Sequence, residues 1–317
     1  MSSSSTAVDV PPSSSLVTAS RPPWLDKTLY PFASHVVDLD EHRIHYIDEG
    51  QGPTLLFLHA NPLWSFQYRN IIRELRTRFR CIAPDYPGFG LSAAARGYQN
   101  TLTGNARLVE RFIHALSLTD ITLVVHDSSV AIGLGVVTRH PAWFRALVIS
   151  NGFAWPLDDF PGIYRFLKIA SSPIVRFLIV NFNLLTRFTV RSIAHGGLSQ
   201  AERRAYLGPF IERGRRHHQH DMFRSIVQSR DYLVDLQERL LELPALPVLL
   251  VFADNDPTYK AGFLSRSEQL FPQHRSVLIA GSDHFPQEHA PEQMAEAIGE
   301  WWDNEVGKGR SWAGTYG

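Results

Sequence analysis

Short apolar segments alternate with longer amphipathic segments over most of the chain. Residues 35–40 and 43–48 alternate apolar and polar positions, which predicts a hairpin of two strands with one solvated face. Continuous apolar runs predict buried strands instead. These runs are residues 54–58, 80–84, 121–125, 146–150, 248–252 and 276–280.

Helical spacing of apolar residues separates these predicted strands. The segments with this spacing are residues 66–78, 103–118, 130–140 and 291–302. Strands that alternate with helices are typical of a parallel sheet covered on both faces. The pattern therefore predicts the α/β class, with a mostly parallel sheet and helices on both sides.

The alternation stops after the sixth predicted strand and resumes about 90 residues later. Between residues 152 and 245 the sequence has only helical apolar spacing, which predicts a helical cap inserted into the α/β core. The Ser-, Thr- and Pro-rich start of the chain predicts a disordered tail. The predicted organisation is tail 1–23, core 24–151 and 246–306, cap 152–245 and C-terminal tail 307–317.

Composition narrows the class of protein. The 317 residues include 31 Lys and Arg and 31 Asp and Glu, and this balance argues against a nucleic-acid partner. We find neither an uninterrupted apolar run of ~18 residues nor a secretory signal, so we expect a cytoplasmic enzyme with no membrane partner. The single cysteine, Cys81, lies in an apolar strand and excludes a disulfide within the chain or a cysteine zinc site.

Polar residues follow four of the predicted strands. Asn61, Asp127, Asp256 and His284 each lie just beyond a strand end, and parallel sheets bind ligands beyond the carboxyl ends of their strands. The last three occur in the order nucleophile, acid, histidine, which is the chain order of the catalytic residues in the α/β-hydrolase fold. A lone Asp after a strand is usually a helix cap, but the agreement of all three positions favours catalysis.

Asp127 is the strongest candidate nucleophile. It lies at a strand-to-helix turn, with Val125 two positions before it and the small Ser129 two positions after it. This fit to the usual small-x-nucleophile-x-small turn is imperfect, but it is better than that of Ser128 or Ser129. A carboxylate can displace a leaving group from a saturated carbon and form an alkyl ester. His284 would then activate water to hydrolyse that ester, while Asp256 orients the imidazole. The backbone N–H groups of Ser128 and Asn61 would hold the oxyanion.

Asp254 and the histidines of residues 213–220 are further candidates for a chemical role. Asp254 is the alternative acid for His284, because it lies in the same loop as Asp256. Residues 213–220 (RGRRHHQH) contain three histidines, but adjacent residues do not share one helix face. We interpret this cluster as a solvated cap surface and expect neither a metal ion nor a cofactor.

Four segments resemble the haloalkane dehalogenase branch of the α/β-hydrolase superfamily. They are residues 59–65 (HANPLWS), 85–92 (DYPGFGLS), 125–127 (VHD) and 283–288 (DHFPQE). The resemblance covers about residues 24–306 and is weakest in the predicted cap. It implies a cap that lines an apolar substrate cavity, and a catalytic acid after either of two strands. Asn151 occupies the earlier of these positions and Asp256 the later, so the resemblance also favours Asp256.

The chain departs from the family at the groups that would hold a released halide. The nucleophile is usually followed by Trp, whose indole N–H binds the halide, but here the residue is Ser128; Ala60 likewise replaces a usual Gly. Asn61 matches the family's other halide donor. The candidate second donors are Trp155, Trp64 and Tyr164.

The resemblance therefore implies hydrolytic dehalogenation of a small apolar substrate by water, without cofactor, and leaves two alternatives open. Epoxide hydrolases share the fold and the Asp nucleophile, but need an acid such as a cap tyrosine; here these are Tyr164, Tyr206 and Tyr232. The other alternative is a binding protein of the hydrolase fold without turnover, suggested by the Ser128–Ser129 turn. The sequence gives neither the substrate nor the oligomeric state.

Overall fold

The computed structural model describes residues 21–193 and 197–307. An eight-stranded sheet forms its centre, in the order β1-β2-β4-β3-β5-β6-β7-β8. Strands β1 and β2 pair antiparallel, as do β2 and β4, and all other neighbours are parallel. The strands are β1 (His35–Leu39), β2 (His42–Glu49), β3 (Thr54–Leu58), β4 (Arg80–Pro84), β5 (Ile121–His126), β6 (Phe144–Ser150), β7 (Val248–Ala253) and β8 (His274–Ile279).

Alternate residues of the central strands face two separate cores. In β3, Leu56 and Leu58 join one cluster, whereas Leu55 and Phe57 join the other. The first cluster includes residues of α2 (Leu102–Ala115), α3 (Ser128–Val137) and α11 (Phe263–Leu270). The second includes residues of α1 (Arg69–Leu75) and α13 (Pro291–Trp301). The sheet is thus buried on both faces, which explains why its strands are continuous apolar runs.

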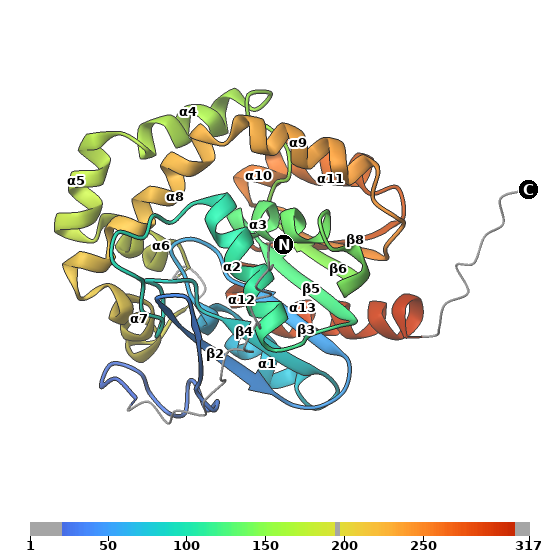
Figure 1. Ribbon diagram of the computed structural model, residues 1–317, viewed down its shortest axis with the longest axis horizontal. Helices are drawn as coiled ribbons and strands as arrows, with labels where there is room; N and C mark the ends of the chain where they lie inside the picture. The colour runs from blue at the N-terminus through green and yellow to red at the C-terminus, as the bar shows by residue number, and fades with distance from the viewer. Residues whose placement is uncertain (1–20, 194–196, 308–317) are drawn as a thin grey trace, which may run out of the picture.

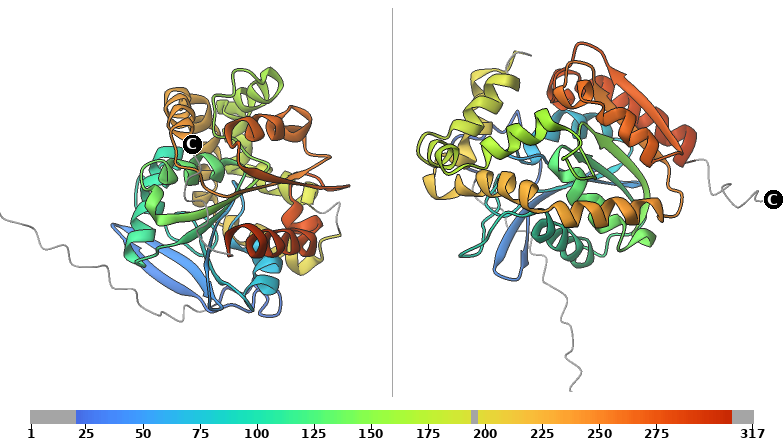
Figure 2. Two further views of the ribbon diagram at one scale, coloured as in Figure 1. Left: turned by 90° about the vertical axis from the view of Figure 1, so that its right-hand side faces the viewer. Right: turned by 90° about the horizontal axis from the view of Figure 1, so that it is seen from above.

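Helices alone connect β6 to β7, and they form the cap. In Figure 1, α4, α5, α8 and α9 follow the upper and left edge of the molecule, and α6 and α7 lie on its left side. Figure 2 shows the same helices from two further directions. The cap helices are α4 (Pro161–Ala170), α5 (Pro173–Phe182), α6 (Leu184–Ile193), α7 (Gln200–Leu207), α8 (His217–Gln228) and α9 (Arg230–Leu241).

The predicted fold class is confirmed, with a helical cap inserted after the sixth strand. Differences lie at element ends and in helices that the sequence pattern did not predict, of which α11 is the longest. The expected helix 66–78 is a 3-10 turn, Ser65–Tyr68, followed by the shorter α1, and α3 begins at Ser128, two residues before the expected start. Two short helices, α10 (Pro257–Lys260) and α12 (Pro286–His289), follow the strand ends that carry Asp256 and His284.

Most of the predicted N-terminal tail and most of the predicted C-terminal tail lie outside the described residues. Among the described helices, no single one is long and apolar enough to cross a bilayer. Helices α5 and α6 pass that test only when taken together, and they meet at a bend of 75°.

Candidate active site

Three loops at the carboxyl ends of β5, β7 and β8 bring Asp127, Asp256 and His284 together. The Nδ1 atom of His284 lies 2.7 Å from Oδ2 of Asp256, and its Nε2 atom lies 3.8 Å from Oδ1 of Asp127. A carboxylate only accepts, so Nδ1 carries the proton in the bond to Asp256. Asp256 is buried, whereas the side chains of Asp127 and His284 are about one quarter exposed. The carboxylate of Asp127 can therefore meet a substrate.

The backbone at Asp127 forms a sharp turn between β5 and α3. Its φ of 55° and ψ of −132° place a non-glycine residue in a costly conformation. Ser129 stabilises this turn, because its hydroxyl lies 2.8 Å from the carbonyl oxygens of both Leu58 and His126 and accepts the N–H of His126. The small residue two positions after Asp127 thus connects the turn to β3.

Burial and charge act in opposite directions on the three ionisable groups. Burial opposes a charged imidazole, but the charge and hydrogen bond of Asp256, together with Asp127, raise the pKa of His284 to about 9. Burial also raises the pKa of Asp127 above its ordinary value, against the opposing effects of His284 and hydrogen bonds from Ser128. Burial would raise the pKa of Asp256, but His284 and Thr258 outweigh it and lower the pKa.

Neighbouring groups fix the position of His284. The side-chain amide of Asn151 donates to the His284 carbonyl oxygen and accepts the N–H of Ala253. His126 packs its ring 4.9 Å from the His284 ring, and burial lowers the pKa of His126 well below the ordinary value, so this neighbour stays neutral. Asp254 instead accepts the N–H of Gly281, 2.8 Å away. The structure therefore places Asp256, and not Asp254, beside His284.

The loop after β3 carries Asn61 and is held by local hydrogen bonds. Nδ1–H of His59 donates to the Ala60 carbonyl oxygen, while its Nε2 accepts the N–H of Tyr86. The Asn61–Pro62 peptide bond is cis. Nδ2 of Asn61 donates to the backbone carbonyl oxygen of Gln219 on α8, 3.1 Å away. Asn61 therefore connects the core to the cap with one of its two amide hydrogens, while its buried Oδ1 has no partner.

The three candidate second donors have different surroundings. The indole N–H of Trp64 donates to the Ala205 carbonyl oxygen at 3.2 Å, which makes it unavailable to a halide in this structure. Tyr164 is half-buried on α4, with the Lys168 ammonium group 5.5 Å from the centre of its ring. Trp155 is buried and its indole N–H has no partner. A buried donor without a partner is costly, so Trp155 is the candidate whose N–H a ligand would satisfy.

The hydroxyls of two cap tyrosines have partners within the protein. Tyr206 donates to the Glu288 carboxylate, and Tyr232 donates to the Ala131 carbonyl oxygen at 2.8 Å. Tyr164 is therefore the remaining cap tyrosine that could act as the acid for an epoxide.

The histidine cluster of the cap is only partly solvated. His218, Gln219 and His220 lie in the first turn of α8 and are buried, so the prediction of a solvated surface is wrong for these residues. The three side chains point in different directions: the His218 ring lies 5.4 Å from the Tyr98 ring of the core, whereas the Gln219 amide donates to Thr186 on cap helix α6.

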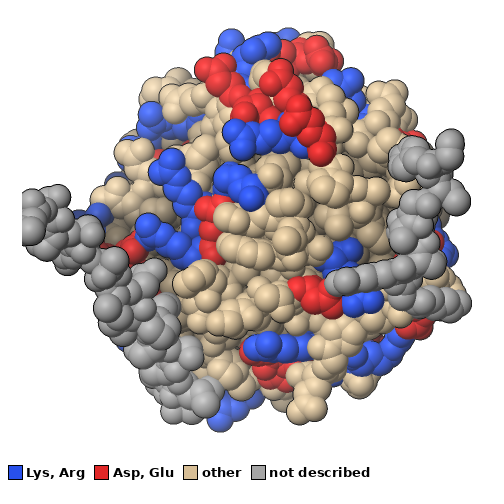
Figure 3. All heavy atoms as spheres, turned by 45° about the vertical axis from the view of Figure 1, so that its right-hand side comes forward, with Lys and Arg blue, Asp and Glu red and all other residues tan. Residues whose placement is uncertain are grey.

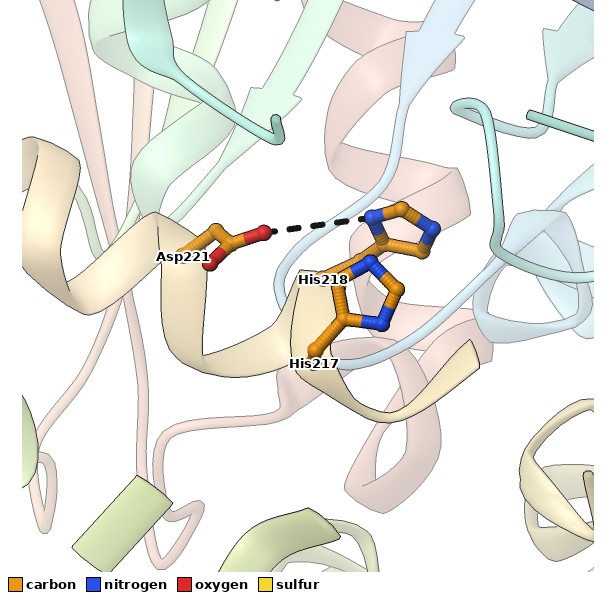
Figure 4. Close-up of side chains that lie close together, drawn as sticks. All are labelled: His217, His218 and Asp221. Carbon is orange, nitrogen blue, oxygen red and sulfur yellow. Dashed lines mark ion pairs between the residues drawn. The ribbon is translucent and has the colours of Figure 1, made fainter. Parts of the chain in front are cut away.

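One group of described side chains is close enough to share a cation. The ligand atoms of His217, His218 and Asp221 lie within 4.8 Å of one another (Figure 4). Burial and the nearby cationic side chains, including Arg215, lower the pKa of His218 to about 3. A guanidinium beside the cluster disfavours a second cation, so we assign no metal there.

The sequence argument missed a buried ion-pair network beside the site. Arg69 of α1 is 1% exposed and pairs with Glu288, four residues after His284, and with Glu202 of the cap. Tyr206 also donates to Glu288. The network therefore connects α1, the cap helix α7 and the short helix α12 that follows His284. The available signal in the sequence was an Arg that shares a predicted helix face with apolar residues, because an Arg that is fully buried is normally paired.

Comparison with known proteins identifies the fold and its relatives. The sequence profile of the family described as alpha/beta hydrolase fold matches residues 53–291. Haloalkane dehalogenase 2 of Mycobacterium tuberculosis is 34% identical over 278 residues, which cover 86% of this chain and 96% of that protein. The structure of the haloalkane dehalogenase DbeA from Bradyrhizobium elkani superposes with a TM-score of 0.78 at 22% identity, covering 85% of this chain and 97% of that one.

A relative with a different activity is also similar along most of its length. The cis-3-alkyl-4-alkyloxetan-2-one decarboxylase of Shewanella oneidensis is 30% identical over 281 residues, which cover 86% of this chain and 88% of that protein.

Proposed function

Because this chain belongs to the α/β-hydrolase family and is similar to haloalkane dehalogenases along most of its length, we propose that it hydrolyses haloalkanes through an alkyl ester on Asp127. The observation that carries this proposal is the position of His284, which contacts Asp256 through one ring nitrogen and faces Asp127 with the other. This arrangement gives a carboxylate nucleophile and a base directed at the ester that it would form.

In the first step, an Asp127 carboxylate oxygen attacks the carbon that bears the halogen. The carbon–oxygen bond forms as the carbon–halogen bond breaks, and the halogen leaves with the electron pair as halide. The step needs an ionised Asp127 but no base. The second amide hydrogen of Asn61 and the unpartnered indole N–H of Trp155 are the donors that we assign to the departing halide.

In the second step, Nε2 of His284 removes a proton from water, and the resulting hydroxide attacks the carboxyl carbon of the ester. The alkyl oxygen takes up the proton of the added hydroxyl and leaves as the alcohol, Asp127 is restored as a carboxylate, and His284 releases its proton to solvent. Asp127 is one of the groups that raise the pKa of His284 to about 9 in the free enzyme. Forming the ester removes that negative charge and lowers the pKa of His284, so the first step prepares the base for the second.

A second candidate function is the decarboxylation of an oxetan-2-one, the activity named for the Shewanella relative. Asp127 would attack ring carbon 4 and break its bond to oxygen, which frees a carboxylate on the neighbouring carbon. Loss of carbon dioxide would then form the carbon–carbon double bond and expel Asp127. No halide leaves, so the presence of Ser128 where the dehalogenases usually have Trp favours this candidate. It also needs no water, and hence no base at His284.

One experiment separates the two candidates. The enzyme is incubated in parallel with 1-bromobutane and with a cis-3,4-dialkyloxetan-2-one, and bromide, alkene and carbon dioxide are measured. We expect bromide and 1-butanol from the first substrate, and none from the Asp127→Asn variant. If the second substrate gives alkene and carbon dioxide while the first gives no bromide, the activity is decarboxylation and not dehalogenation. Turnover of neither substrate would contradict both.

A further inference from the structure

Large apolar side chains are exposed along the outer cap helices α4, α5 and α6. Seven of the ten exposed large apolar side chains of the described residues lie there, with exposures from 43% to 74%. They are Phe166, Ile169, Ile174, Phe177, Phe182, Leu184 and Phe188. We call this set the outer cap face. Helix α5 contacts both α4 and α6, so these side chains lie on neighbouring helices. Exposed apolar side chains gathered in this way are typical of an interaction site, whereas single exposed apolar residues are ordinary.

The same helices carry positive charge without any negative charge. Five of the 31 basic residues lie between residues 161 and 193, but none of the 31 acidic residues does. All five are exposed; they are Arg165, Lys168, Arg176, Arg187 and Arg191. On the face of the molecule shown in Figure 3, by contrast, basic and acidic side chains lie next to one another.

Elements packed beside the outer cap face do not cancel its charge. Arg213 and Arg216 donate to Asn181 near the end of α5, which adds two cations at that edge. Asp158, which precedes α4, is already paired with Arg230. Asp159, Glu212 and Asp221 are the further acidic groups near this edge, and Asp159 also lies near Arg230. These three carboxylates are outnumbered by the five cations of the helices together with Arg213 and Arg216.

We propose that the outer cap face binds the surface of a lipid bilayer that contains anionic headgroups. Phe, Ile and Leu side chains enter the boundary between headgroups and acyl chains, while the Arg and Lys side chains contact the lipid phosphates. Each of α4, α5 and α6 has 10 residues, or about 15 Å, which is half the ~30 Å of a bilayer core. The helices therefore lie in the interface and do not cross it.

A second copy of this chain fits the outer cap face less well. Two such faces placed together would oppose five cations with five more and bring no acidic partner, and like charges close together are unfavourable. An anionic bilayer supplies both the apolar region and the negative charge. This proposal departs from our sequence-based expectation of no membrane partner, which rested on the absence of a spanning segment. It does not rest on the proposed reaction.

Vesicle flotation with the full-length chain tests this proposal. Vesicles of phosphatidylcholine alone are compared with vesicles that also contain phosphatidylglycerol. We expect binding to the second kind, and weakening of that binding as salt is added. Phe188→Ser reduces the affinity by about tenfold or more, and Arg176→Glu reduces it by about fivefold or more.

The matched control is Leu241→Ser. Leu241 is 68% exposed, close to the 65% of Phe188, but lies at the end of α9 outside the outer cap face. We expect Leu241→Ser to bind as the parent chain does, and circular dichroism confirms folding of each variant. No flotation with anionic vesicles, or equal loss in the Phe188 and Leu241 variants, would overturn the proposal. So would a concentration-dependent dimer that Phe188→Ser disrupts while vesicles are not bound.

Discussion

At the carboxyl ends of β5, β7 and β8, polar side chains are held by specific partners, whereas the basic side chains of α4, α5 and α6 are exposed. Asp256 is buried and bonded to His284, and Asn151 secures the His284 backbone. On the outer cap face, by contrast, apolar and cationic side chains are exposed without acidic neighbours on the same helices. The first region has the precise geometry that chemistry needs, and the second has the composition that surface binding needs.

The two regions contribute different properties: one carries the reaction, and the other binds a surface. The strand ends determine which bond the protein attacks, because atoms must lie within a few tenths of an ångström of a productive position. Binding by the outer cap face requires only apolar area and charge. Changes in one region should therefore leave the property of the other nearly intact.

The largest expected effect is at the nucleophile. Asp127→Ala should lower turnover of 1-bromobutane by about 10⁴-fold or more, because no other group forms the ester. Phe177→Ser on the outer cap face should leave turnover of this soluble substrate within about twofold. Bromide release under identical conditions measures both. Comparable losses of turnover in the two variants would contradict the expectation that the two regions have separate roles.

The next effect concerns the ion-pair network that connects α1 and α12 to the cap helix α7. Glu288→Gln removes the more buried of the two carboxylates paired with Arg69 and leaves only Glu202, and breaking a buried ion pair costs about 3–5 kcal/mol. We expect urea unfolding to show a loss of this size. Asp303→Asn is the control, because it breaks the exposed pair with Arg78 and should cost about 0–1 kcal/mol. Equal losses would mean that Arg69 is not the connection between core and cap.

Trp155 tests whether the buried, unpartnered N–H has a catalytic role. Trp155→Phe keeps an aromatic ring but removes the donor, so we expect turnover of 1-chlorobutane to fall by about 10²-fold. Turnover of 1-iodobutane should fall less, because iodide needs less stabilisation as it leaves. Stability should fall by about 1–3 kcal/mol because the smaller ring leaves a cavity, and not because a hydrogen bond is lost, since the N–H has no partner. An unchanged chloride rate would exclude Trp155 as the second halide donor.

The pH dependence should differ between the two chemical steps. Ester hydrolysis needs neutral His284, whose pKa is about 9 in the free enzyme and falls when the ester forms. Below that lowered pKa, hydrolysis should slow by about tenfold per pH unit. Ester formation should continue until Asp127 is protonated, at a pKa raised by burial but still acidic. Rapid-quench measurements resolve the steps, and one common pH profile would contradict this assignment of roles.

The fold, and the convergence of three polar side chains at one edge of the sheet, could be predicted from sequence because they depend on local patterns. Apolar runs such as residues 54–58 mark the strands, and the polar residues that follow them converge at one edge of a parallel sheet. The order of Asp127, Asp256 and His284 along the chain then indicates the chemistry. Each of these signals lies within a few residues of a strand end.

No local sequence pattern indicates the contacts between the core and the cap. Trp64 was a candidate halide donor, but its N–H bonds to Ala205, 141 positions away. Asn61 similarly contacts Gln219, 158 positions away. Partners this distant are set by how the cap packs on the core, which no local spacing encodes. For the same reason, the burial of His218 could not be anticipated from a run of polar residues.

The most direct test of the covalent mechanism is intact-mass spectrometry of His284→Phe after exposure to 1-bromobutane. Asp127 remains able to attack, but water is no longer activated, so we predict that the protein gains the mass of a butyl group without bromine. Peptide mapping should locate that mass on Asp127, and the double variant Asp127→Asn with His284→Phe should show none. A folded His284→Phe protein that gains no mass, while the parent chain releases bromide, would contradict the alkyl-ester mechanism.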